Sequence, residues 1–256
     1  MIIPSGWLRD ILPSTLRLSL VYFHYSDTTG MYLIHPLPAP IPAHDLALLA
    51  RAEPATVGHF CTIGFMDAGI RAHSQDLRVA GTAVTVRMPG TDGGILHHAM
   101  GCVRPGDILV IDRCGEAVTA AFGGAMAYAA SQAGVAGLIV DGLVTDLGEL
   151  RQHGVPVWSR GPSIVTTRVL GLDGEFCGPV SCGGVAVHPG DAVLADENGV
   201  LVLPRGRIHA AARQAIDFQE REKLTLARLR AGEKFPDIVG SRAAIDGNIA
   251  MASTQG

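Results

Sequence analysis

The stretch Ala136-Gly-Leu-Ile-Val-Asp-Gly-Leu-Val-Thr-Asp-Leu-Gly-Glu149 decides the fold class of this chain. Its first part, residues 136–141, is an apolar run between turn residues, which is typical of a buried strand. A loop is expected at 142–145, and residues 146–153 predict a short helix that ends at Gly154. A buried strand that leads through a short loop into a helix is the repeating unit of α/β proteins.

The same alternation continues on both sides of this stretch. Residues 80–88 and 107–112 predict strands, and residues 43–50, 54–65, 95–102 and 117–133 predict helices. Later segments read as short strands between Gly and Pro turns, at 155–158, 165–169, 183–187, 191–195 and 200–203. Residues 207–234 predict a charged amphipathic helix. We therefore expect a mixed α/β fold with a partly parallel sheet and a β-rich second half.

The pattern divides the chain into a single domain with two flanking segments. Residues 42–232 contain no internal linker and are expected to form one α/β domain. Residues 1–41 include a Pro-rich stretch and are expected to be a poorly packed extension, and residues 233–256 to be a tail. The 32 glycines suit tight turns and close approach of the backbone to a ligand.

Composition excludes several classes of protein. A net charge of -4 argues against a nucleic-acid binder, which usually has a basic surface. Mean hydropathy is +0.29, but no apolar run is long enough to span a membrane. The five cysteines form no CxxC motif and no even disulfide set, which favours a reducing, cytoplasmic location.

Two acidic residues follow the deciding strand. Asp146 stands at the strand-to-helix junction and Glu149 three residues later, so both side chains share one helix face. Two carboxylates in this arrangement can hold a hard divalent cation, directly or through water. The alternative is that Asp146 caps the helix and Glu149 is solvated.

A second candidate lies at Phe122-Gly-Gly-Ala-Met126, before a predicted helix. Glycines there leave backbone N–H groups open to a carboxylate or phosphate, although close helix–sheet packing explains them equally. The chain has no GxGxxG after a strand and no GxSxG, so a dinucleotide site and an α/β-hydrolase nucleophile are not expected.

An ordered set of motifs resembles one known family, that of ribonuclease-activity-regulator-A-like proteins. The family includes the 4-hydroxy-4-methyl-2-oxoglutarate / 4-carboxy-4-hydroxy-2-oxoadipate aldolases. The resemblance covers roughly residues 42–232. The motifs that carry it are Asp92-Gly-Gly-Ile-Leu-His-His-Ala-Met100, Pro105-Gly-Asp-Ile-Leu-Val-Ile-Asp112, Phe122-Gly-Gly-Ala-Met126, 134–150, Val155-Pro-Val-Trp-Ser-Arg-Gly161 and Pro189-Gly-Asp-Ala-Val-Leu-Ala-Asp-Glu-Asn-Gly-Val200.

The resemblance implies a compact layered α/β sandwich that assembles as a homotrimer or a dimer of trimers. It also implies a metal-dependent aldolase, in which Mg²⁺ or Mn²⁺ polarises a 2-oxo acid and stabilises a pyruvate enolate. The same chemistry decarboxylates oxaloacetate. By position, Asp146 matches the metal ligand and Glu149 a second acidic residue. Gly123, Gly124, Ala125 and Met126 match the segment whose backbone binds the keto-acid carboxylate.

The chain departs from the aldolases at three positions. They carry Arg where this chain has Thr145, usually an acidic residue in place of Gly124, and often Asn in place of Gly93. Thr cannot replace the bidentate charge pairing of Arg. Arg113, in a neighbouring loop, is a candidate substitute cation. We expect a lyase of altered specificity, and the alternative is a non-catalytic, protein-binding relative.

Overall fold

The computed structural model describes residues 31–74 and 77–246. Within them, ten strands form one large sheet whose main order is β1-β8-β3-β4-β6-β7-β2. Off this order, β11 pairs with β3 and with β12, and β5 pairs with β6. The strands of this sheet are β1 (Met31–Ile34), β2 (Arg71–Ala72), β3 (Val79–Arg87), β4 (Asp107–Asp112), β5 (Ala120–Phe122), β6 (Gly137–Val144), β7 (Val157–Pro162), β8 (Asp173–Phe176), β11 (Ala192–Asp196) and β12 (Gly199–Leu203).

The centre of the sheet is parallel. Strand β4 pairs in parallel with β3 and β6, and β6 pairs in parallel with β5 and β7. These strands come from uninterrupted apolar runs, as expected where both faces of a sheet are covered. Their carboxyl ends lie along one edge, which is where α/β proteins usually bind ligands.

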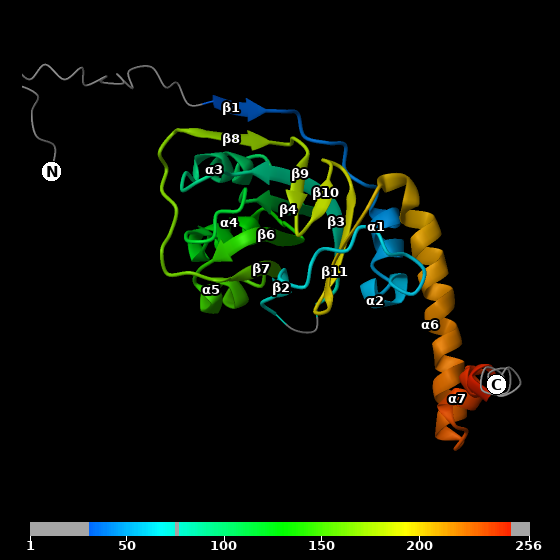
Figure 1. Cartoon of the computed structure of the whole chain (residues 1–256). Helices are drawn as coiled ribbons and strands as arrows, with labels where there is room; N and C mark the ends of the chain where they lie inside the picture. Colours follow the sequence, from blue (N-terminus) through cyan, green and yellow to red (C-terminus); the bar gives the residue numbers. More distant parts are fainter. Residues whose placement is uncertain (1–30, 75–76, 247–256) are drawn as a thin grey trace, which may run out of the picture.

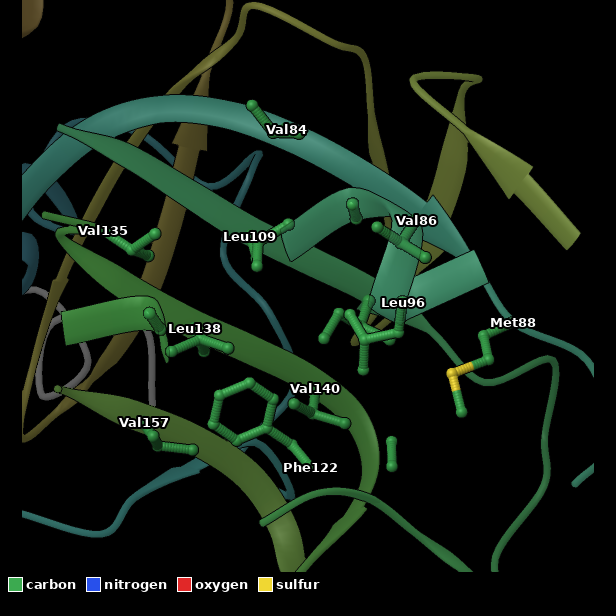
Figure 2. Close-up of a cluster of buried hydrophobic side chains, with 14 of the residues drawn as sticks. Val84, Val86, Met88, Leu96, Leu109, Phe122, Val135, Leu138, Val140 and Val157 are labelled. Carbon is green, nitrogen blue, oxygen red and sulfur yellow. The ribbon is translucent and has the colours of Figure 1, made fainter. Parts of the chain in front are cut away.

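Three short helices cover one face of this parallel centre: α3 (Gly94–Met100), α4 (Gly124–Gln132) and α5 (Leu147–Gln152). Side chains from the helices and from β3, β4, β6 and β7 form a buried cluster between the two layers. Figure 2 shows Phe122 within this cluster, close to Val140 and Leu138. Because β5 ends at Phe122 and α4 begins two residues later, the cluster fixes the start of α4 relative to the sheet.

The opposite face is covered by β-structure. A hairpin of β9 (Val180–Cys182) and β10 (Val185–Val187) packs there with β11 and β12 against Trp158. A third cluster joins β11 and β12 to α1 (Ala43–Leu49), α2 (Pro54–Val57) and the 23-residue helix α6 (Ile208–Arg230). A 3-10 turn, Arg205–Arg207, precedes α6. Figure 1 shows α6 continuing beyond the sheet toward α7 (Phe235–Ile238).

The predicted strands and helices of the parallel centre are confirmed, with two corrections at the site. The helix expected over 117–133 is wrong in its first part, because Ala120–Phe122 is strand β5. The loop expected at 142–145 is also wrong, because β6 continues to Val144. Both errors come from strand pairing at the end of β6, where Leu143 and Val144 pair with β5 on one side and with β7 on the other.

Three further expectations need correction. Residues 165–169 form no strand, and only isolated bridges join Thr166 to Ala120 and Arg168 to Asp92. The short helix expected over 54–65 is confined to Pro54–Val57. The extension expected over 1–41 ends earlier, because β1 pairs with β8 and Ile41 is buried. Residues 1–30 and 247–256 of the expected extension and tail lie outside the described residues.

No helix in the described part of the chain combines the length and apolarity needed to cross a membrane. All five cysteines are free.

Candidate active site

Asp146 stands between β6 and α5 in an unusual backbone conformation. Its φ and ψ are 55° and 42°, in the left-handed region. Only a few per cent of non-glycine residues adopt this region, and Asp is among those that tolerate it best. Such a conformation costs about 1–3 kcal/mol and is often found at functional sites.

The carboxylate of Asp146 does not cap its own helix. A capping Asp has extended backbone angles and accepts an N–H from the first turn of the same helix, whereas Asp146 makes no such bond. Instead its Oδ2 accepts the N–H of Gly124, at the start of α4, at 2.9 Å. The Thr145 hydroxyl donates to Oδ1 at 3.2 Å. The geometry therefore rules out the helix-cap alternative for this side chain.

Gly123 and Gly124 are required by carboxylates, not by helix–sheet packing. A Cβ at Gly123 would lie 2.7 Å from Asp146 Oδ2 and 2.8 Å from Thr145 Cγ2. A Cβ at Gly124 would lie 1.7 Å from Glu149 Oε2. Both carboxylates of the predicted pair thus converge on the start of α4. The structure brings Asp146, Glu149, Gly123 and Gly124 together, as the sequence predicts.

The first turn of α4 offers further donors. An α-helix leaves its first N–H groups without partners inside the helix. Gly124 gives its N–H to Asp146, while no partner is recorded within 31–74 and 77–246 for the N–H groups of Ala125 and Met126. Ala125 is exposed and Met126 half-buried. These two N–H groups can donate hydrogen bonds to the carboxylate of a ligand that lies beside the Asp146–Glu149 pair.

The charges at this point are unbalanced. Asp146 and Glu149 are exposed, and neither forms an ion pair with any residue that the structure describes. The described residues contain no group of three or more His, Cys, Asp or Glu side chains able to hold a metal. Two carboxylates do fit Mg²⁺ or Mn²⁺, since Mg²⁺ commonly takes one or two carboxylates and completes its shell with water and substrate oxygens.

The pairing of β5 with β6 assembles this site. Thr145 donates its backbone N–H to the carbonyl of Phe122 at 2.8 Å, immediately before Gly123. Thr145 is therefore at the site, as predicted, and its hydroxyl helps to orient Asp146. The sequence spacing predicts that Asp146 and Glu149 share a site. It does not predict their contact with Gly124, because Gly124 and Asp146 are 22 residues apart and are brought together only by the pairing of β5 with β6.

Arg113 occupies a different environment. Its side chain is fully buried and donates to the carbonyls of Met88 and Gly90. It also pairs with Glu116 and donates to the Thr119 hydroxyl. Burial alone would raise the pKa of Glu116, but hydrogen bonds from Arg113 and Thr119 outweigh it and lower the pKa to about 2. In the structure this guanidinium holds two loops together, and the geometry does not support its role as a substrate cation.

Gly93 and Asp92 belong to a neighbouring structural element. A Cβ at Gly93 would lie 3.1 Å from Thr167 Oγ1. Thr167 belongs to a segment, 163–172, that runs parallel to β5 at Ala120. Buried Asp92 holds that segment by accepting the N–H groups of Leu170 and Leu172. The sequence gives no indication of this contact beyond an Asp before two glycines.

The charge state of Asp92 follows from its donors. Burial alone would raise its pKa, but the N–H groups of Leu170, Leu172 and Gly94 and the hydroxyl of Tyr32 outweigh it. The net effect lowers the pKa of Asp92 to about 2. Asp92 is therefore ionised near neutral pH and ties β1, α3 and the 163–172 segment together.

Comparisons with known proteins agree with the fold. The family described as RraA-like, Aldolase/RraA, matches residues 56–202. A Halalkalibacterium halodurans relative is 32% identical over 158 residues, which cover 60% of this chain and 75% of that protein. The 4-hydroxy-4-methyl-2-oxoglutarate aldolase of Thermus thermophilus is 34% identical over 127 residues, which cover 50% of this chain and 76% of the aldolase.

A solved structure gives the same result. Streptomyces coelicolor RraAS2, described as an unusual member of the RNase ES inhibitor RraA protein family, superposes with a TM-score of 0.66 at 28% identity. The superposition covers 73% of this chain and 98% of RraAS2. The match spans the parallel sheet, the helices on its face and the residues of the candidate site, and the chain accordingly belongs to the RraA-like, Aldolase/RraA family.

Proposed function

We propose that this protein is a divalent-metal-dependent lyase that acts on a 2-oxo acid. The reaction is the aldol cleavage of a 4-hydroxy-2-oxo acid to pyruvate, or the decarboxylation of oxaloacetate. The observation that carries the proposal is the strained Asp146, whose carboxylate turns away from its own helix and onto the N–H of Gly124. Relatives that are named aldolases support the same class of reaction.

Each residue of the site has a role in this proposal. Asp146 would bind the cation, with Glu149 beside it as the second acidic group. The N–H groups of Ala125 and Met126 would hold the substrate carboxylate. Mg²⁺ or Mn²⁺, when bound, polarises the 2-oxo carbonyl and stabilises the charge that develops as the carbon–carbon bond breaks. The left-handed backbone at Asp146 aims its carboxylate at α4, where the carboxylate of the substrate would lie.

Specificity is expected to differ from that of the aldolases that the chain resembles. Thr145 places a hydroxyl where those enzymes place a guanidinium, and that hydroxyl donates to Asp146. A substrate with a second carboxylate would therefore lack its bidentate partner. We propose that this enzyme prefers a 2-oxo acid whose distal end is less charged.

The decisive experiment measures pyruvate release from oxaloacetate and from a 4-hydroxy-2-oxo acid, with Mg²⁺, with Mn²⁺ and with EDTA. We expect turnover of at least one substrate with metal and its loss with EDTA. Absence of turnover with both substrates, together with absence of metal binding, would refute the proposal. Asp146→Ala serves as the inactive control.

A second candidate function is protein binding without catalysis. The structural similarity to RraAS2, a member of an RNase-inhibitor family, favours it, as does the Thr at position 145. This alternative predicts that binding of a partner protein tolerates EDTA and the Asp146→Ala change. The lyase proposal predicts that both treatments abolish activity.

Assembly as a homotrimer, or as a hexamer of two trimers, is also part of the proposal. The 163–172 segment carries exposed apolar side chains, and Ile164 is 97% exposed, with Val169 and Leu172 about half exposed. Exposed apolar side chains that gather in one segment are typical of protein interfaces. Light scattering after size-exclusion chromatography would test the subunit number, and a monomer at micromolar concentration would contradict it.

A further inference from the structure

Strand β1 forms one end of the large sheet. Within 31–74 and 77–246 it pairs only with β8, in parallel along its whole length. The N–H of His35 continues this pairing by donating to the carbonyl of Phe176 at 3.0 Å. Because the backbone groups of successive strand residues point to alternate sides, those of Tyr32 and Ile34 face away from β8. An edge of this kind is a template for one more strand.

The side chains of β1 leave apolar surface exposed on both faces of this edge. All four residues are apolar or aromatic, and their exposed fractions run from 36% at Tyr32 to 72% at Met31. On one face the strand borders an open cavity of about 380 Å³, which is lined by Tyr32, Ile34, Gly94, Ile95, His98 and Val169. Natural edge strands are usually protected by charges or proline, and residues 31–34 contain neither.

This surface is held rigidly from below. The Tyr32 hydroxyl donates to Asp92 at 2.9 Å, and the same carboxylate accepts the N–H groups of Leu170 and Leu172. The edge strand and the 163–172 wall of the cavity are therefore fixed to one buried acid. A preordered surface loses little freedom when a further segment binds to it.

We propose that residues 16–23 of this chain bind here, as an antiparallel strand on the free edge of β1. Residues 1–30 lie outside the described part of the chain and are joined to β1 at Met31, which places them at this edge. The sequence Leu16-Arg-Leu-Ser-Leu-Val-Tyr-Phe23 has apolar residues at alternate positions from 16 to 22, a pattern typical of a strand. Residues 24–30 contain Ser-Asp-Thr-Thr-Gly, which is typical of a connecting loop. Binding at β1 goes beyond the proposed function and does not depend on it.

The connection 24–30 sets the register of the added strand. It places Tyr22 opposite Tyr32 and Leu20 opposite Ile34, so both side chains cover the cavity. Residues 21 and 23 then lie over the exposed side chains of the other face of β1. The short connection also favours this segment over a separate partner, because it raises the effective concentration to about the millimolar range.

The first test is hydrogen–deuterium exchange of the full chain, resolved residue by residue by fragmentation mass spectrometry. The amides of Tyr32 and Ile34 should exchange at least about tenfold more slowly in the wild type than in Leu20→Asp, whose charge expels the strand. The amide of Leu33, which faces β8, should change less. Ser26→Asp places the same charge in the connection and should keep the exchange rates of the wild type.

A designed disulfide tests the register. Val21→Cys combined with Leu33→Cys puts two thiols at an opposed pair whose Cα atoms lie about 4.5 Å apart, a separation that a disulfide can span. Glutathione disulfide should link the two within one chain, detected as a cross-linked peptide. Val21→Cys combined with Ile34→Cys points the thiols to opposite faces and should not link.

Equal exchange at Tyr32 and Ile34 in the wild type and Leu20→Asp would overturn the inference, and so would failure of the Val21–Leu33 pair to link. Protection that rises with protein concentration and survives Leu20→Asp would assign the edge to a second copy of the chain, and would equally refute it.

Discussion

Asp146→Gly should remove the proposed cation site while leaving stability nearly unchanged. Glycine adopts the left-handed conformation without strain, so the change relieves about 1 kcal/mol at φ 55°. It also removes the hydrogen bond from Gly124 N–H, at 2.9 Å, and the contact with the Thr145 hydroxyl. Hydrogen bonds to a charged acceptor contribute about 1.5–3 kcal/mol, and less where the acceptor is exposed, as here. The two effects largely cancel, and the free energy of unfolding should fall by no more than about 1 kcal/mol.

Two measurements on the same protein test this reasoning. Urea unfolding gives the change in stability, and Mn²⁺ titration with pyruvate release gives the change at the site. Asp146→Asn is the matched control, because Asn also tolerates the left-handed region and keeps an acceptor for Gly124 N–H but lacks the charge. Both variants should bind Mn²⁺ at least about a hundredfold more weakly. A loss of more than about 3 kcal/mol in Asp146→Gly, with Mn²⁺ affinity retained, would show that Asp146 is a structural residue.

Three further predictions concern specificity and stability. Thr145→Arg should raise kcat/KM for aldol cleavage of dicarboxylic substrates by about a hundredfold, because one charged contact to the transition state is typically worth that much. An unchanged kcat/KM would show that the missing arginine charge does not limit specificity. The pKa of Asp92 in the fold is about 2, below its ordinary value of 3.8. The ionised form therefore contributes about 2 kcal/mol of stability above pH 4, and this contribution is lost as the pH falls toward 2. Asp92→Asn should therefore be less stable than the wild type in urea at pH 7, with a smaller difference at pH 3; equal stability at pH 7 would contradict this. Trp158→Phe leaves the buried carbonyl of Asp196 without its 2.7 Å donor and should cost about 1–3 kcal/mol in thermal or urea unfolding.

The parts of the fold that could be predicted share one physical property. Strand 107–112 and the first part of β6, residues 137–141, are apolar runs buried on both faces, so their composition alone distinguishes them from loops. Strand β5, by contrast, is Ala120-Ala-Phe122, and alanine is the best helix former. It becomes a strand only because β6 offers a parallel partner, and a partner distant in sequence is not visible in local composition.

The candidate site also has one part that local sequence predicts and another part that only tertiary contacts create. The spacing of Asp146 and Glu149 indicates a shared helix face, and that local relation is present in the structure. Their contact with α4 depends on β5–β6 pairing, and the space beneath Gly124 depends on a side chain from another helix. For Arg113 the sequence prediction is not supported. Its position in a loop suggests a free cation, but in the folded protein the side chain is buried and paired with Glu116.

The energetics of the site favour a ligand over a purely structural role. Asp146 has a strained backbone and Glu149 adds a like charge beside it, while no ion pair with either is recorded in the described part of the chain. Both features disfavour the folded state, by about 1–3 kcal/mol for the backbone and a few tenths of a kcal/mol for the charges. Neither side chain fills the core, so glycine at 146 and a neutral residue at 149 would leave no cavity and cost little stability. A cation bound between the two carboxylates would remove their repulsion and would account for the strained backbone at Asp146. A non-catalytic scaffold would need neither the strain nor the paired charges.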